Sequence, residues 1–361
     1  MQENAYISRN VESFTMKTFR LMSLISLLGL FACGNGYKSL SVNEFENAVD
    51  QSGVTLVDVR TPDEYAEGHL PGAVNCDCQA EDFLAQAEAA FPKETPLAVY
   101  CRSGKRSAEA AARLAKAGYT VCDLAGGILA WADAGKRVTR YEVESFRTAS
   151  GKKVAITLIK HGSLEICYDG LSLQFDPVSG LGKPTDYAAE FPKADFIFVT
   201  HEHGDHYDPT AIDALQGEQT QLITNARCAE MRGAGEVMTN GDSRTIRDDI
   251  RVDAVPAYNY TEGHENFHPK GRDNGFVLTI DGLRIYVAGD TEDIPEMSDI
   301  KDIDVAFLPV NQPYTMTVDQ CVAAAKVLQP KVLIPYHFSR TDLSALPEQL
   351  PGIKVLLRQM Q

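Results

Sequence analysis

The feature that most constrains this chain is the segment 200–206, which reads Thr-His-Glu-His-Gly-Asp-His and directly follows the apolar run 196–199. Imidazole and carboxylate groups are ligands of zinc, iron and manganese. The apolar run predicts a strand that ends in a short loop, which can aim several ligands at one point. One such histidine alone could be a surface or core residue. Four potential ligands at H-x-H-x-D-H spacing after a strand predict a metal site.

Length and charge narrow the classes of protein that remain. The chain has 361 residues, which favours two domains, and 44% of its residues are hydrophobic, which is enough for real cores. Its formal net charge of −16 argues against a nucleic-acid-binding protein, which would need a basic face. The same charge disfavours polybasic attachment to anionic lipid. We therefore expect a small-molecule substrate and no nucleic-acid partner.

The eight cysteines include no C-x-x-C pair, so neither a zinc ribbon nor a thioredoxin-type redox motif is indicated. Cys76 and Cys78 form the only close pair. Alternate residues of a strand point to one face, which favours half-buried packing residues over a redox couple.

The N-terminal segment has the pattern of an export signal. Met16, Lys17 and Arg20 give a basic start, residues 21–31 are apolar, and small residues follow around Cys33. This pattern is typical of a secretion signal and too short for a spanning helix. The end of the run, residues 30–33, resembles the bacterial lipobox, in which the cysteine becomes lipidated. We predict a signal segment over 1–33 and a protein of the cell envelope. It would meet the membrane only through a lipid anchor at Cys33, or would otherwise be periplasmic. The alternative for the apolar run is a buried helix.

A first folded unit is predicted over 38–136. Ser41 to Glu44 is a capping box that opens a helix, and Pro62 stands at the first position of another helix. Strands are predicted at 54–57, 97–100 and 121–124, with an alanine-rich helix after the second and a last helix around Trp131. Strands that alternate with helices imply a parallel sheet and an α/β domain.

A cysteine stands where the second of these strands meets its helix, followed by a basic loop. The run is Cys101, Arg102, Ser103, Gly104, Lys105 and Arg106. Backbone N–H groups of such a loop and the helix N-terminus would face the sulfur, and the basic side chains add positive charge. All of these favour a thiolate and would stabilise a persulfide or an incoming oxyanion. An ordinary strand-end cysteine is the alternative.

This first unit resembles a rhodanese domain. Residues 56–60, 68–73, 100–107 and 126–131 match the recurring pieces of that family in order. The resemblance implies that Cys101 carries sulfane sulfur from a thiol or sulfane-sulfur donor to an acceptor. It also implies that Asp58 and Arg60 orient and support the loop. The C-x4-R length from Cys101 to Arg106 is shorter than in related phosphatases, which favours sulfur transfer.

The second unit is predicted over 152–361, after a polar linker over 137–151. Short strands follow in series, and helices are expected near 209–216, 226–232 and 317–328. Two mixed sheets with helices outside, an α+β αββα sandwich, fit this order. Further candidate ligands stand at the ends of elements: His264, His268, Asp290 and His337.

This unit resembles the metallo-β-lactamase superfamily, nearest to a branch that contains sugar-phosphate lactonases. The segments 200–206, 286–291 and 335–337 carry the resemblance. It implies that His201 and His203 bind one metal ion, and that His268, or alternatively His264, completes that site. The remaining implied ligands are Asp205, His206 and His337 for a second ion, with Asp290 between the two ions. Zinc is the expected metal, one or two ions, with manganese or iron open.

Bound metal would activate water at neutral pH, with Asp205 or Asp290 handling the proton, which predicts hydrolysis of an ester, lactone or phosphodiester. The leading interpretation is an exported sulfurtransferase fused to this hydrolase. Two alternatives remain: an iron persulfide dioxygenase coupled to its rhodanese, and a non-catalytic sulfur carrier or docking module in the envelope.

Overall fold

We describe a computed structural model, whose described residues are 36–360. The chain divides into two compact units, with the boundary between Arg140 and Tyr141. Each unit has its own sheets and its own hydrophobic core. The predicted signal segment and Cys33 lie outside the described residues. Within residues 36–360, none of the helices has the length and apolar character needed to cross a membrane.

The first unit is built on a five-stranded sheet in the order β1-β5-β4-β2-β3, and all its pairings are parallel. The strands are β1 (Tyr37–Leu40), β2 (Thr55–Asp58), β3 (Val74–Asn75), β4 (Leu97–Tyr100) and β5 (Val121–Leu124). The helices are α2 (Val42–Val49), α3 (Pro62–Glu67), α4 (Phe83–Ala90), α5 (Lys105–Lys116) and α6 (Gly127–Asp133). The prediction of a parallel α/β domain is confirmed.

Alternate residues of the strands bury the two faces of this sheet. Leu97 and Val99 of β4 pack in one core cluster with residues of α4 and α5. Ala98 and Tyr100 pack in the other, with residues of α2 and α6. A parallel sheet is covered on both faces, which is why β4 is buried along its whole length. Its C-terminal end therefore delivers Cys101 to the edge of the sheet.

The second unit contains two seven-stranded mixed sheets. The first has the order β12-β11-β10-β9-β8-β7-β6. Its strands are β6 (Glu142–Arg147), β7 (Lys153–Lys160), β8 (Ser163–Tyr168), β9 (Leu171–Phe175), β10 (Phe196–Val199), β11 (Gln221–Thr224) and β12 (Glu236–Val237). The second sheet runs in chain order, with β13 (Ser243–Arg247), β14 (Ile250–Ala257), β15 (Asp273–Ile280), β16 (Leu283–Val287), β17 (Val305–Pro309), β18 (Val332–Tyr336) and β19 (Lys354–Val355).

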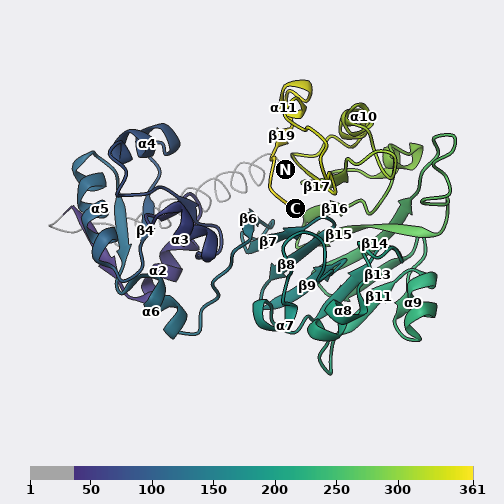
Figure 1. Ribbon diagram of the computed structural model, residues 1–361, viewed down its shortest axis with the longest axis horizontal. Helices are drawn as coiled ribbons and strands as arrows, with labels where there is room; N and C mark the ends of the chain where they lie inside the picture. Colours follow the sequence, from purple (N-terminus) through teal and green to yellow (C-terminus); the bar gives the residue numbers. More distant parts are fainter. Residues whose placement is uncertain (1–35, 361) are drawn as a thin grey trace, which may run out of the picture. The chain divides into compact units, whose positions relative to one another are not determined.

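The two sheets pack face to face and helices cover their outer faces (Figure 1). The largest core cluster joins Leu164 and Phe198 of the first sheet to Phe276 and Ile285 of the second. The outer face of the first sheet is covered by α7 (Tyr187–Glu190), α8 (Pro209–Leu215) and α9 (Ala226–Arg232). The outer face of the second is covered by η1 (Pro295–Asp299), α10 (Val318–Leu328) and α11 (Leu346–Gln349). The predicted αββα sandwich is confirmed.

The predicted linker over 137–151 is wrong in its middle part. Residues 142–147 form β6, the edge strand of the first sheet, and pair antiparallel with β7. An edge strand has one side open to solvent, so it tolerates polar residues such as Glu142 and Arg147. That polar composition is what made the segment look like a linker. Phe146 packs partly against the core of the second unit.

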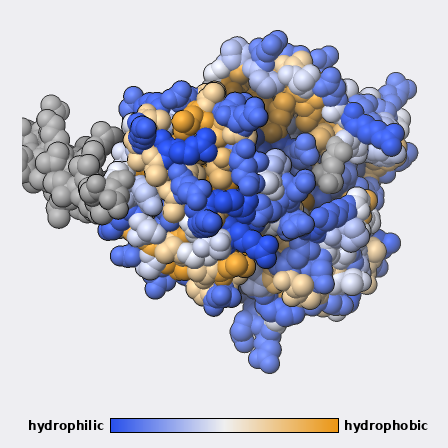
Figure 2. Space-filling view, turned by 60° about the vertical axis from the view of Figure 1, so that its left-hand side comes forward, coloured by the Kyte–Doolittle hydropathy of each residue, from blue (hydrophilic) through white to orange (hydrophobic). Residues whose placement is uncertain are grey.

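Hydrophilic side chains predominate on the face shown in Figure 2, with apolar side chains in smaller groups between them.

Candidate metal centre and cysteine loop

The segment 200–206 begins where β10 ends, at the C-terminal edge of the first sheet of the second unit. Asp176, which follows the neighbouring parallel strand β9, fixes the start of this loop. Its Oδ1 accepts a hydrogen bond from the Thr200 backbone N–H at 2.7 Å, and its Oδ2 accepts one from the Thr200 hydroxyl at 2.7 Å. The ends of two adjacent strands therefore hold the motif in place.

One group of donor atoms comes from His201, His203 and His268, and these atoms all lie within 4.8 Å of one another. His268 is buried and lies in the loop between β14 and β15, where its carbonyl accepts a hydrogen bond from the Asn259 N–H at 2.9 Å. The alternative residue, His264, belongs to none of the candidate groups among residues 36–360, and its Nδ1 lies 3.5 Å from Glu292 Oε1. The structure thus brings His268 to the first site.

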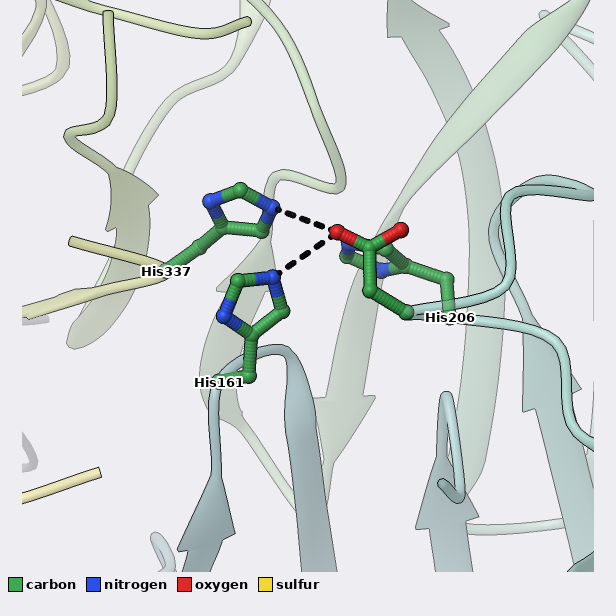
Figure 3. A group of neighbouring side chains, drawn as sticks. His161, His206 and His337 are labelled. Carbon is green, nitrogen blue, oxygen red and sulfur yellow. Dashed lines mark hydrogen bonds and ion pairs between the residues drawn. The ribbon is translucent and has the colours of Figure 1, made fainter. Parts of the chain in front are cut away.

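A second group comes from Asp205, His206 and His337, joined by His161, with donor atoms again within 4.8 Å of one another. His337 follows β18, and its Nε2 lies 3.5 Å from Asp205 Oδ2. His161 lies in the turn between β7 and β8, and its Nε2 lies 3.0 Å from that same oxygen. In Figure 3, dashed lines join the rings of His161 and His337 to one carboxylate oxygen.

Asp290, which follows β16, lies between the two groups. Its Oδ2 is 3.4 Å from Nε2 of His268 and 3.1 Å from Nε2 of His337. Its Oδ1 is 3.2 Å from Nε2 of His206. One buried carboxylate thus touches ligand candidates of both sites, which is the arrangement expected of a group that bridges two cations.

The outer nitrogens of three of these histidines are held by second partners. Nδ1 of His206 lies 2.8 Å from Asp176, and Nδ1 of His268 lies 3.0 Å from Asp273. Nδ1 of His201 lies 2.9 Å from the Thr200 hydroxyl. Such contacts fix ring orientation and leave Nε2 free to face a metal ion.

The inner atoms lack hydrogen-bond partners. Nε2 of His201, His206 and His337 and Oδ1 of Asp290 are buried and make no hydrogen bond of good geometry, although Asp290 lies close to all three nitrogens. An unpaired buried polar atom costs free energy, so each of these atoms requires an explanation. A pair of cations among them would supply it, and imidazole with carboxylate is a suitable donor set. The residues therefore fit two divalent metal ions.

The protonation states suit cation binding at the first site. Burial lowers the pKa of His201 well below its usual value and also lowers that of His203, which favours the neutral, ligating form of both rings. Burial alone would raise the pKa of Asp290, but the nearby His206 and His337 hold it well below its ordinary range. Asp290 is therefore an anion between the two groups.

Sequence reasoning missed His161, Asp176 and Asp273. His161 directly follows a strand, which is the signal that identified Asp290 and His337. Asp176 likewise follows β9, one strand away from the motif. Asp273 opens β15 and showed no pattern of its own. A search for polar residues at every strand end would have found the first two.

In the first unit, Cys101 lies between β4 and α5 and is buried. Its Sγ accepts hydrogen bonds from the Gly104 N–H at 3.2 Å and from the Ser107 hydroxyl at 3.4 Å. Arg102, Ser103 and Lys105 are exposed around it. Of the predicted cradle, Gly104 donates to the sulfur, and Ser107 adds a second donor.

Gly127 lets this loop pack against the start of α6. The Ile128 N–H donates to the carbonyl of Cys101 at 2.8 Å. A Cβ on Gly127 would lie 2.4 Å from that carbonyl oxygen, and the residue has a φ of 61°. Both the close approach and the left-handed backbone require glycine.

Arg106 is paired with a carboxylate. Its guanidinium donates to both carboxylate oxygens of Glu64, each at 2.7 Å. Part of the positive charge expected beside Cys101 is therefore neutralised. The hydrogen bonds from Arg106 also lower the pKa of Glu64 to about 2, so this pair ties α3 to the start of α5.

Asp58 and Arg60 form a buried ion pair. Nε of Arg60 donates to Asp58 Oδ1 at 2.9 Å, and the guanidinium also donates to the Gly68 carbonyl at 2.6 Å. The Tyr100 hydroxyl donates to Asp58 Oδ2 at 2.7 Å. These contacts join β2, β4 and the loop after α3, which suits the supporting role expected of both residues.

Comparisons with known proteins agree with both units. Residues 41–134 match the rhodanese-like domain, and residues 155–337 match the beta-lactamase superfamily domain. A UPF0173 metal-dependent hydrolase of Pelotomaculum thermopropionicum is 32% identical over 166 residues, which cover 43% of this chain and 72% of that protein. One of Enterococcus faecalis is 31% identical, over 54% of this chain and 93% of that protein. A crystal structure from Parabacteroides distasonis, of a protein classed as a metal-dependent hydrolase, is 53% identical with a TM-score of 0.59, covering 61% of this chain and all of that one.

The sandwich and its paired histidine groups define a metal-dependent hydrolase of the metallo-β-lactamase fold, preceded here by a rhodanese-like domain. The chain belongs to the beta-lactamase superfamily, and its relatives within it are the UPF0173 metal-dependent hydrolases.

Proposed function

We propose that the second unit uses two divalent cations to hydrolyse an ester, lactone or phosphodiester, as in the lactonase-like branch of its superfamily. Zinc is the metal we expect first, followed by manganese or iron. The observation that carries this proposal is the buried carboxylate of Asp290 between two histidine groups. When bound, the ions would lower the pKa of a water molecule and polarise an oxygen of the scissile bond.

The chain's own residues divide the remaining work. His201, His203 and His268 would hold one ion, and Asp205, His206 and His337 the other. The Asp205 side chain is 35% exposed, more than those of its ligand neighbours, so its carboxylate is the one that substrate can reach. Burial alone would raise its pKa, but His161 and His337 hold it below its ordinary value. Asp205 would therefore remain an anion and a weak base, which suits it to hold the ion and to orient a water molecule beside it.

Metal content and turnover test this function together. We expect the purified full-length protein to hold two zinc or manganese ions and to cleave members of a lactone, ester and phosphodiester panel. His203→Ala should lose the first ion and the hydrolysis. One iron per chain, with oxygen consumed in the presence of glutathione persulfide, would instead establish the persulfide dioxygenase alternative.

We also propose that the first unit is a sulfurtransferase. The supporting observation is the pair of donors, Gly104 N–H and Ser107 hydroxyl, on Cys101 Sγ. The Cys101 thiolate would attack the sulfane sulfur of a donor such as thiosulfate, whose S–S bond breaks to release sulfite and leave a persulfide. An acceptor nucleophile would then take the outer sulfur and restore the thiolate. The donors would stabilise the anionic persulfide.

Thiocyanate formation from thiosulfate and cyanide measures this activity. Cys101→Ser should abolish it, whereas Cys167→Ser, the same change at a cysteine in β8 of the other unit, should leave it intact. Equal rates in wild type and Cys101→Ser would reject sulfur transfer at this site and favour the carrier or docking role.

For the cellular setting, we propose an exported protein that is lipid-anchored at Cys33, on the basis of residues 16–33 alone. Metabolic labelling with palmitate should mark the wild-type protein and fail to mark Cys33→Ser. Labelling of both proteins would exclude lipidation at Cys33.

A further inference from the structure

His161 is held beside the second site by backbone contacts from distant parts of the chain. Its N–H donates to the carbonyl of Met360 at 2.6 Å, and its own carbonyl accepts from the His337 N–H at 3.2 Å. Its φ is 46°, in the left-handed region that bulky residues avoid. The β7–β8 turn is thus tied to the end of β18 and to the C-terminal segment, and this fixes the position of the ring.

The imidazole of His161 faces the same point as the other donors of the second group. Its ring centroid lies 3.7 Å from that of His337 and 5.7 Å from that of His206. Nε2 of His161 and Nε2 of His337 lie 3.0 and 3.5 Å from one oxygen of Asp205. Figure 3 shows both rings pointing at that oxygen from one side.

The two nitrogen-to-oxygen separations, from His161 and His337 to Asp205, are those of a shared coordination sphere. Ligand atoms at about 2.0–2.1 Å from a tetrahedral ion lie about 3.4 Å apart. The four donor atoms of His161, Asp205, His206 and His337 all lie within 4.8 Å of one another, so a small closure of the group would bring them to bonding distance. The side chain of His161 is only 16% exposed, which leaves limited room for water in its place.

We propose that His161 is a ligand of the second metal ion, an inference that rests on the two-metal site of the proposed function. Four side chains and the shared Asp290 would then surround this ion. A filled ligand set is typical of structural sites, whereas catalytic sites keep an open position. The first site, with three histidines and the shared Asp290, would have one ligand fewer and would be the one with room for a substrate oxygen.

The competing role is a hydrogen bond from His161 to Asp205 without contact to the metal. The magnitude of the effect on metal affinity separates the two roles. Loss of an outer hydrogen-bonding partner weakens metal binding about 10- to 100-fold, whereas loss of a ligand should cost more than about 100-fold. The loss variant is His161→Asn, because asparagine tolerates the positive φ at this position.

Cobalt(II) binding to the full-length protein, after removal of metal by chelation, provides the test. Wild type should bind two ions, and His161→Asn should bind the first unchanged and the second more than about 100-fold more weakly. His161→Cys should gain a thiolate-to-cobalt charge-transfer band in a difference spectrum against wild type. His264→Asn and His264→Cys, matched changes at a histidine outside the candidate groups, should do neither.

The ligand assignment alone would be overturned if His161→Asn bound two ions with wild-type affinity. It would also be overturned if the affinity of the second ion fell by 100-fold or less and His161→Cys gained no new band. Fewer than two ions in wild type would instead reject the two-metal function, and the ligand assignment with it.

Discussion

Nδ1 of His206 lies 2.8 Å from Oδ2 of Asp176, and both side chains are fully buried. Asp176 also accepts two hydrogen bonds from Thr200, so one carboxylate fixes both the start of the motif and the ring of its last histidine. An anionic partner on the outer nitrogen makes Nε2 of the imidazole a stronger ligand.

Asp176→Asn should therefore weaken binding of the second metal ion by about 10- to 100-fold. Asparagine keeps the size of the side chain and tolerates the φ of 41° at this position, so the backbone should be preserved. Competition against a chelating dye measures the change. Asp249→Asn, at a partly exposed carboxylate paired with Arg247, is the control and should leave both affinities unchanged. Equal affinities in wild type and Asp176→Asn would show that Asp176 does not support the metal.

Gly162 lies directly against the same imidazole ring, that of His206. A Cβ at this position would lie 2.6 Å from Cε1 of His206, closer than real Cβ contacts allow, and His206 is enclosed on its other sides. Gly162→Ala should displace the imidazole and lower the affinity of the second ion at least about tenfold, since outer-shell disturbances have that magnitude. Gly180→Ala, where an added Cβ meets no atom within 4 Å, should bind metal normally. Titration with cobalt(II) compares the two variants, and equal binding would contradict the packing argument.

The sequence was sufficient to predict both folds because their central elements carry strong local patterns. β4 and β10 are short apolar runs that are buried along their whole length, and each ends directly at a functional residue. Strand β6 escaped prediction because an edge strand needs few apolar residues, so Glu142 and Arg147 read as part of a linker.

The site was predictable only as far as its residues carried a motif. His201, His203 and His206 stand together, and Asp290 and His337 follow apolar strands. The significance of His161 depends on contacts with Met360 and His337, nearly two hundred residues further along the chain, and no local pattern records those contacts. The pairing of Arg106 with Glu64 likewise has no local sequence pattern, because α3 and α5 come together only in the folded unit.

The pair of Glu64 and Arg106 predicts a pH dependence of stability in the first unit. The pKa of Glu64 falls from 4.5 to about 2 on folding, through hydrogen bonds from Arg106. A carboxyl group with a lowered folded-state pKa contributes stability above its unfolded pKa, and this contribution is lost as pH falls toward the folded value. The stabilisation should therefore be complete above about pH 5 and decline between pH 4.5 and 2.

Glu64→Gln removes this charge and keeps the capping box with Thr61, because glutamine also serves in that position. The two side chains are 25% and 28% exposed, so solvent screening should reduce the effect to about 1 kcal/mol at neutral pH. Trp131, the only tryptophan of the chain, lies in α6 and reports unfolding of this unit by its fluorescence. The difference between wild type and Glu64→Gln should shrink as pH is lowered from 7 to 3. A difference that stays constant over this range would show that the charge of Glu64 is not its source.

Removal of metal should destabilise the second unit alone. Its buried histidines and Asp290 present inner atoms without hydrogen bonds. Cations that bind only the folded state stabilise it by mass action. Metal at one hundred times its dissociation constant contributes about 2.7 kcal/mol per ion, so chelation should lower the unfolding temperature of this unit by several degrees. Far-ultraviolet circular dichroism should record this shift, whereas the transition seen by Trp131 in the first unit should stay in place. Asp290→Asn, which alters the carboxylate between both sites, should respond less to chelation than wild type does. An equal shift of the Trp131 transition would mean that the two units unfold together.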